Sequence, residues 1–143
     1  MSNKHKIIFD TDPGVDDTIA IYAALRSPQI EIVGFTTIFG NVDVDLATVN
    51  ALRILEIAGR TDIPVVKGAK NPLAGTYSGP VPFVHGDNGQ GNIALAPPVT
   101  TAKEGTAAQF IIDQVMKNSG EIVLVAVGPL TNLALALRLQ PDI

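Results

Sequence analysis

Cysteine is absent from this sequence of 143 residues. Its absence excludes disulfide bonds, thiolate metal sites and a cysteine nucleophile. Basic residues are also outnumbered: ten Lys and Arg stand against fourteen Asp and Glu, for a formal net charge of −4. Because nucleic acids and anionic membranes are bound through basic surfaces, we expect neither as a partner.

Long hydrophobic runs are missing as well. The most apolar uncharged stretch, 122–137, is interrupted by glycine, proline and polar residues at 128–132. It is shorter than the roughly 20 apolar residues of a membrane span. Near the N-terminus, the apolar run 7–9 is far shorter than that of a secretory signal. We therefore expect a soluble, cytoplasmic protein.

The chain does contain enough apolar material for a buried core, since 46% of its residues are hydrophobic. Short β-rich segments alternate with segments of helical periodicity. Strands are expected at 6–10, 30–39, 63–66 and 121–127, and helices at 16–26, 43–58, 105–117 and 129–139. This alternation predicts an α/β fold: an open, mostly parallel, Rossmann-like sheet with helices on both faces.

Three details of this pattern lead to specific expectations. Asp12 followed by Pro13 is typical of a helix start, with Asp12 as the N-cap. The continuously apolar segment 121–127 is typical of a strand buried on both faces. The segment 68–100 holds nearly half of the glycines and prolines and has almost no periodicity, which predicts a long functional loop.

Four carboxylates lie close together where the first strand meets the first helix: Asp10, Asp12, Asp16 and Asp17. Ligands of open α/β sheets bind at the carboxyl ends of the strands, which is where this cluster falls. A buried carboxylate is costly, and a helix N-terminus offsets only ~0.3–1 kcal/mol per acid. A bound cation is the natural compensation, and an all-oxygen ligand set favours Ca²⁺ or Mg²⁺.

Other interpretations of the acidic cluster are weaker. An EF-hand loop does not fit, because counting from Asp10 places Val15 where that loop requires glycine. Each acid alone has a purely structural explanation, Asp12 as a helix cap and Asp16 and Asp17 as first-turn acids. The four together are better explained by a ligand site.

The segment Asp10–Ala20 resembles the signature of the inosine-uridine-preferring nucleoside hydrolases, with all four acids in place. Three further segments resemble motifs of that family in the same order: 36–41 (TTIFGN), 84–89 (VHGDNG) and 127–132 (VGPLTN). The resemblance covers essentially the whole chain.

This resemblance implies an enzyme that uses one bound Ca²⁺ to hydrolyse the N-glycosidic bond of ribonucleosides, giving ribose and a free base. Carried over by motif, Asp12 would be both the general base and a calcium ligand. Asp17 and the main-chain carbonyl of Val127 would be further calcium ligands. Asp10 would lie behind these ligands as a supporting carboxylate.

The resemblance also implies the residues that contact the substrate. Asp16 would bind ribose hydroxyls, Asn41 would help place the attacking water and bind the substrate, and His85 would line the base pocket, with loop 68–100 as its wall. From the residues alone, Asn41 is also an ordinary turn residue after a strand, and His85 is also explained as a loop histidine. The motifs do not distinguish purine from pyrimidine nucleosides.

Members of this family are about twice as long as this chain, and their second half supplies further calcium- and ribose-binding residues. We therefore expect residues 1–143 to be the N-terminal part of a single nucleoside-hydrolase-like α/β domain, apparently truncated. The family forms dimers or tetramers, and the same homo-oligomers are expected of the full-length protein.

Two alternative functions remain open. The sequence Asp10-Thr11-Asp12 after a strand also fits a phosphatase of the haloacid-dehalogenase type, which uses a nucleophilic Asp, a general-acid Asp and Mg²⁺. The following Pro13-Gly14 does not match that motif. The second alternative is a half-domain that binds calcium or ribose without turnover.

Overall fold

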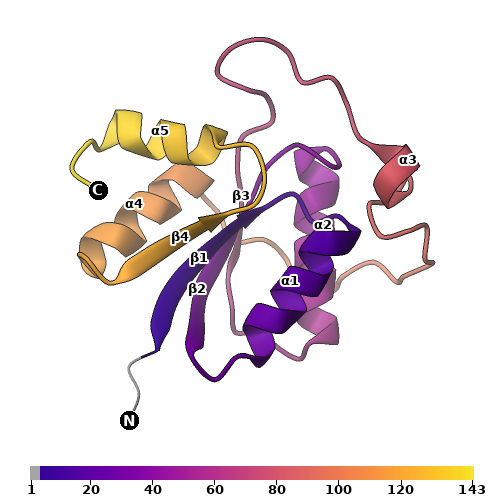
Figure 1. Ribbon diagram of the computed structural model, residues 1–143, viewed down its shortest axis with the longest axis horizontal. Helices are drawn as coiled ribbons and strands as arrows, with labels where there is room; N and C mark the ends of the chain where they lie inside the picture. Colours follow the sequence, from indigo (N-terminus) through magenta and orange to yellow (C-terminus); the bar gives the residue numbers. More distant parts are fainter. Residues whose placement is uncertain (1–3) are drawn as a thin grey trace.

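A four-stranded parallel sheet forms the centre of the structure, a computed structural model that describes residues 4–143 (Figure 1). Its strands are β1 (His5–Thr11), β2 (Ile30–Thr37), β3 (Val65–Lys67) and β4 (Ile122–Ala126). They lie in the order β3-β2-β1-β4, and every pairing is parallel. The predicted α/β fold is therefore confirmed, and the carboxyl end of β1 lies between those of β2 and β4.

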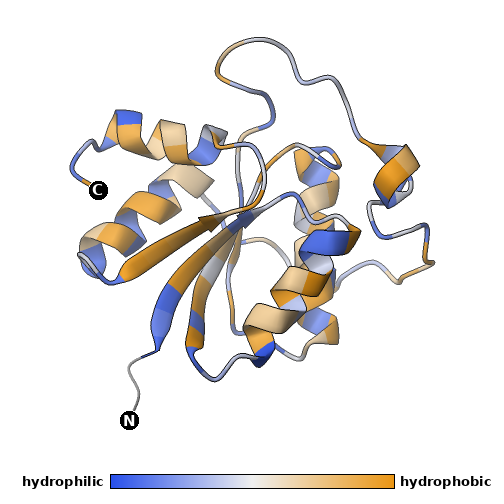
Figure 2. Ribbon diagram, viewed as in Figure 1, coloured by the Kyte–Doolittle hydropathy of each residue, from blue (hydrophilic) through white to orange (hydrophobic). Residues whose placement is uncertain are grey.

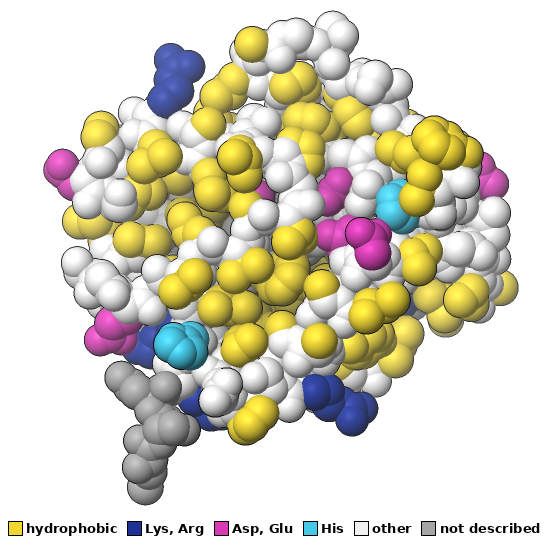
Figure 3. Space-filling model, viewed as in Figure 1, with side chains coloured by type: hydrophobic (Ala, Val, Ile, Leu, Met, Phe, Trp, Pro, Cys, Tyr) yellow, Lys and Arg dark blue, Asp and Glu magenta, His cyan; other side chains and the backbone are white. Residues whose placement is uncertain are grey.

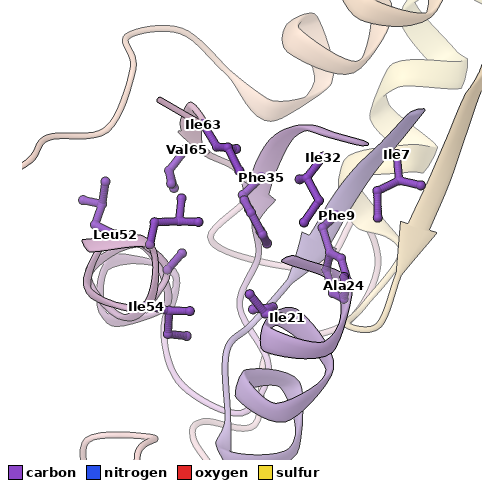
Figure 4. Close-up of a cluster of buried hydrophobic side chains, with 12 residues drawn as sticks. Ile7, Phe9, Ile21, Ala24, Ile32, Phe35, Leu52, Ile54, Ile63 and Val65 are labelled. Atoms are coloured by element: carbon purple, nitrogen blue, oxygen red, sulfur yellow. The ribbon is translucent and has the colours of Figure 1, made fainter. Parts of the chain in front are cut away.

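The helices are α1 (Val15–Arg26), α2 (Val44–Ile57), α3 (Pro82–His85), α4 (Ala107–Lys117) and α5 (Thr131–Leu139). All but α3 cover the two faces of the sheet (Figure 1). Side chains of α1 and α2 pack with Ile7 and Phe9 of β1 on one face (Figure 4). Side chains of α4 and α5 pack with Ile8 on the other face. Successive strand residues point to opposite faces, so one apolar run supplies both cores.

Phe35 lies at the centre of the larger core. It is fully buried, and its ring is stacked on that of Phe9, its partner in the strand register, with centroids 5.6 Å apart. This pair joins β1 to β2 directly below the ends of the strands that carry the acidic cluster.

We expect Phe35→Ala to lower the free energy of unfolding by about 3–5 kcal/mol, because it leaves a cavity in a packed core. The measurement is urea unfolding followed by circular dichroism. Phe83→Ala is the matched control: Phe83 is 89% exposed, and its truncation should change the free energy of unfolding by no more than about 0.5 kcal/mol. Equal urea midpoints for the two variants would contradict this assignment of the core.

Several element boundaries differ from those predicted. The N-cap of α1 is Gly14, so the prediction of Asp12 as N-cap is wrong. The carboxylate of Asp17 accepts the Gly14 N–H at 3.1 Å and takes the capping role. The second strand ends at Thr37 rather than at 39, and the third spans 65–67 rather than 63–66. The short helix α3 lies inside the segment expected to be a loop.

The prediction that the fourth strand is buried on both faces is also wrong. Strand β4 is hydrophobic along its length (Figure 2), yet it lies at an edge of the sheet and Val123 is 49% exposed. Apolar composition indicates that a strand prefers burial, but it does not fix the position of that strand in the sheet order. Within residues 4–143, no helix combines the length and apolar character needed to cross a bilayer.

Candidate active site

The ends of three neighbouring strands meet at one cavity. Asp12 follows β1, Asn41 follows β2 and Val127 follows β4. All three line a cavity of about 610 Å³ whose outer wall is formed by the segment 72–81. The structure thus brings together three of the residues predicted to form the site, at the edge of the sheet where ligands of this fold class bind.

Asp12 is held in this cavity by one hydrogen bond. The residue is 3% exposed, and Oδ2 accepts the main-chain N–H of Asn41 at 2.6 Å. The other oxygen, Oδ1, is buried without a hydrogen-bond partner. Burial and the nearby charge of Asp17 raise the pKa of Asp12 to about 7, against the lowering effect of the Asn41 hydrogen bond. The Asp12 carboxylate therefore keeps one unbonded oxygen, and its surroundings do not compensate its negative charge.

Two glycines make room for the Asp12 carboxylate. A Cβ atom added to Gly40 would overlap Oδ2 of Asp12, and one added to Gly128 would lie 2.7 Å from Oδ1. These glycines belong to the turns after β2 and β4. The side chain of Asp12 thus lies between two turns, and any residue larger than glycine at position 40 or 128 would occupy part of its space.

Asn41 connects the two carboxylates predicted to hold a metal. Its main chain contacts Asp12, and its side-chain Nδ2 donates to Oδ2 of Asp17 at 2.9 Å. The other oxygen of Asp17 accepts the hydroxyl of Thr11 at 3.0 Å. Asp17 is buried, so these bonds fix its orientation. Asn41 is therefore more than a turn residue.

Asp10 lies behind this pair in the sheet and is fully buried. Its Oδ1 accepts the hydroxyl of Thr36 at 2.5 Å and the amide of Asn132 at 2.8 Å, whereas Oδ2 has no partner. Burial raises the pKa of Asp10 to about 6, against the lowering effect of these two hydrogen bonds. Asp10 is not among the described residues that line the cavity, so it lies behind the cavity rather than in its wall.

Asn132 was not among the residues predicted for the site. From the second position of α5, its Nδ2 also donates to the Thr37 carbonyl at 3.0 Å, and its Oδ1 accepts the Ala69 N–H at 2.9 Å. It therefore ties together β1, β2, α5 and the segment after β3. The sequence signal that could have identified Asn132 is the presence of a polar residue in an otherwise apolar helical segment.

Asp16 and His85 lie on the other side of the Gly14 turn. Asp16 has an 82% exposed side chain, and its Oδ1 is 3.7 Å from Nδ1 of His85, which is buried at the end of α3. Figure 3 shows acidic side chains next to a histidine beside α3. Neither residue lines the 610 Å³ cavity within residues 4–143. A Cβ added to Gly14 would contact both the His85 ring and the Asn41 side chain. These two side chains therefore lie on either side of Gly14.

Tyr77 is the second site residue that the sequence did not reveal. Its hydroxyl donates to the Gly40 carbonyl at 2.9 Å, and its ring lies 5.0 Å from that of Phe39. The Val81 N–H donates to the Asn41 carbonyl at 3.0 Å. The segment between β3 and α3, seen as an arch in Figure 1, is thus fastened to the turn that holds Asp12.

The donor set of this site fits a hard cation. Oδ1 of Asp12 is a buried carboxylate oxygen without a partner, and no Lys or Arg is found among the described residues that line the cavity. Over residues 4–143, no three side chains of His, Cys, Asp or Glu converge as a complete metal site. Two carboxylates and a main-chain carbonyl from this chain would therefore form only part of a coordination shell.

Comparison with known proteins agrees with this geometry. A profile of the family described as inosine-uridine preferring nucleoside hydrolase matches residues 7–143. The chain belongs to this family. The expected family resemblance is therefore confirmed over all the segments that carried it.

Relatives in the nucleoside hydrolase family come from plants, protozoa and bacteria. The chain is 50% identical over 99% of its length to a probable uridine nucleosidase 2 of Arabidopsis thaliana, of which it covers 44%. It is 40% identical over 96% of its length to the inosine-uridine preferring nucleoside hydrolase of Leishmania major, of which it covers 44%. The chain thus spans less than half the length of these curated relatives.

Solved structures of nucleoside hydrolases share the fold. A plant nucleoside hydrolase superposes with a TM-score of 0.92 at 46% identity, over 96% of this chain and 43% of that structure. A purine-preferring ribonucleoside hydrolase from Gardnerella vaginalis superposes with a TM-score of 0.92 at 39% identity, over 96% of this chain and 44% of that one.

Proposed function

We propose that the protein containing this chain hydrolyses the N-glycosidic bond of ribonucleosides in a calcium-dependent reaction, releasing ribose and the free base. The observation that carries the proposal is the Asp12 carboxylate, which is oriented by Asn41 and keeps one buried oxygen free in the cavity. Names of relatives include both uridine nucleosidases and a purine-preferring enzyme. The proposal therefore covers ribonucleosides as a class.

The proposed calcium ligands from this chain are the carboxylates of Asp12 and Asp17 and the main-chain carbonyl of Val127. When bound, such an ion lowers the pKa of a coordinated water and orients it. The remaining ligands would come from outside residues 4–143. Asn41 keeps the two carboxylates at a fixed separation through its main-chain and side-chain donors.

Asp12 is proposed as the general base, because its free oxygen Oδ1 can take a proton from the attacking water while Oδ2 stays bonded to Asn41. Cleavage of the glycosidic bond develops positive charge on the ribose. The carboxylates around the turn stabilise that charge, with Asp10 behind them. Exposed Asp16 is proposed to bind ribose hydroxyls, and His85 is proposed to face the base.

The phosphatase alternative requires Asp10 as a nucleophile. Asp10 is fully buried and is not among the described residues that line the cavity, so neither of its oxygens is offered to a substrate there. Together with the family match, this favours nucleoside hydrolysis. The other alternative, a half-domain that binds calcium or ribose without turnover, is distinguished from the hydrolase by the calcium experiment below.

Several expectations about the whole protein accompany this proposal. Residues 1–143 are proposed to be the N-terminal part of one α/β domain, and the full-length protein to be a dimer or tetramer in the cytoplasm. A ribonucleoside is the proposed partner molecule, and the net charge of −4 argues against nucleic acid and anionic membranes.

Calcium removal is the direct test of the cofactor. We expect the full-length protein to release ribose from inosine or uridine, to lose this activity with a chelator and to regain it with added Ca²⁺. Calcium at ~100 times its Kd should also raise the free energy of unfolding by about 2.7 kcal/mol through mass action. Activity in excess chelator would contradict calcium dependence. Calcium binding without ribose release would support the non-catalytic half-domain.

A further inference from the structure

The segment after His85 folds back on itself as a compact loop. The Gly91 N–H donates to the His85 carbonyl at 2.7 Å. The Asn88 side chain accepts the N–H groups of Gln90 and Asn92 at 2.8 and 2.9 Å. These bonds lie within the loop, so they connect the His85 end of the loop to the segment that carries Gln90.

Gln90 fastens this loop to the turn that precedes α1. Its side chain is buried, and Nε2 lies 3.3 Å from the Pro13 carbonyl oxygen and 3.4 Å from that of Gly14. Nε2 also lies 3.0 Å from the Thr18 hydroxyl oxygen and 3.1 Å from the Gly89 carbonyl oxygen, so its two hydrogens are shared among four acceptors. Carbonyl oxygens only accept, so the amide must direct its NH₂ group toward the turn.

Asn50 reinforces the same attachment from α2. It is fully buried, and its Nδ2 donates to the Asn88 carbonyl at 2.9 Å and to the Pro13 carbonyl at 3.3 Å. Two buried amides thus hold the loop and the turn together. Buried amides of this kind are costly to leave unpaired, so the attachment resists opening.

The His85 ring contacts the same turn directly. Nδ1 of His85 accepts the Val15 N–H at 3.3 Å. A ring nitrogen that accepts a hydrogen bond carries no proton, so the neutral ring has its proton on Nε2. Gln90 bridges from the same loop to the same turn.

We propose that Gln90 is a positioning residue: through the contacts of its Nε2 with the Pro13 and Gly14 carbonyls and the Thr18 hydroxyl, it holds His85 with Nδ1 on the Val15 N–H and so leaves Nε2–H as the donor of the ring. The contact between His85 and a nucleoside rests on the proposed function. The orientation of the His85 ring does not depend on the proposed function, so an experiment can refute one of these hypotheses without refuting the other.

The first test needs no substrate. Long-range ¹H–¹⁵N NMR of the full-length protein, with the His85 ring assigned by its loss in His85→Gln, should show the Nε2–H tautomer. Gln90→Leu should convert this pattern to a mixture of tautomers. Gln90→Glu should disturb it at least as strongly, because a carboxylate faces two carbonyl oxygens. A wild-type Nδ1–H tautomer, or an unchanged pattern in Gln90→Leu, would overturn the proposal.

The second test is kinetic. Gln90→Leu should lower kcat/KM for a nucleoside by about tenfold, mostly through KM, since small displacements of a positioning group are expensive. Calcium affinity should not change, because Gln90 bonds to the turn rather than to Asp12 or Asp17. The matched control is Gln109→Leu on the exposed face of α4, expected to leave both measurements unchanged. Wild-type kinetics in Gln90→Leu would count against the role proposed for Gln90. If the wild-type protein showed the expected His85 tautomer but released no ribose, only the proposed function would be refuted.

Discussion

Asp12→Asn is expected to abolish ribose release by the full-length protein while leaving its fold intact. Asparagine matches aspartate in shape, and its side-chain oxygen can still accept the Asn41 N–H. It cannot take a proton from water, and loss of a general base costs about 10²–10⁴ in rate. It is also a weaker calcium ligand, so the loss should fall at the upper end of that range. The measurement is the initial rate of ribose release at saturating calcium.

The same substitution separates function from stability. It removes a buried negative charge whose Oδ1 has no partner, so the melting temperature in chelator should not fall. Asp113→Asn, on the exposed face of α4, is the matched control and should keep wild-type activity. Near-normal turnover in Asp12→Asn would defeat the assignment of this residue as the base.

Gly40→Ala is the second substitution with a large expected effect. The added Cβ would occupy the space of the Asp12 carboxylate, with Cγ of that residue only 2.8 Å away and Pro129 at 3.1 Å. Either the carboxylate or the Gly40-Asn41 turn must move. We expect about a hundredfold loss of kcat/KM, because misplaced reacting groups lose orientation, and a stability loss of about 1–3 kcal/mol from overpacking.

Gly59→Ala controls for the general cost of replacing glycine. Gly59 has φ of +67° and nothing within 4 Å of an added Cβ, so alanine there strains the backbone without touching the site. It should cost about 1 kcal/mol of stability with no change in kcat/KM. If both glycine variants lost stability equally and kept full activity, the close fit around Asp12 would have no functional meaning.

The position of the site could be predicted from the sequence because it depends on which residues directly follow each strand along the chain. Each strand is followed by its polar residues, and parallel strands place their carboxyl ends together. The alternation of β-rich and helical segments was sufficient for the fold. Asp12 and Asn41 could therefore be placed near one another without knowledge of any contact between them.

The contacts between distant segments could not be predicted. Asp12 looked like a helix cap because Pro13 follows it, but its carboxylate is bonded to Asn41 after the next strand, and Gly14 takes the cap position. Tyr77 carries no local signal either, because its role depends on where an aperiodic loop returns to the sheet. Such roles depend on the order of strands and on loop paths, which composition and periodicity do not encode.

The exposed position of β4 has a consequence for handling the molecule. Within residues 4–143, only β1 pairs with β4, so its outer side offers main-chain hydrogen-bonding groups beside a half-exposed Val123. Unprotected strands of this kind template further strand addition and aggregation. A preparation of residues 1–143 alone is therefore expected to self-associate as its concentration rises, and light scattering from such samples would report this edge rather than a native oligomer.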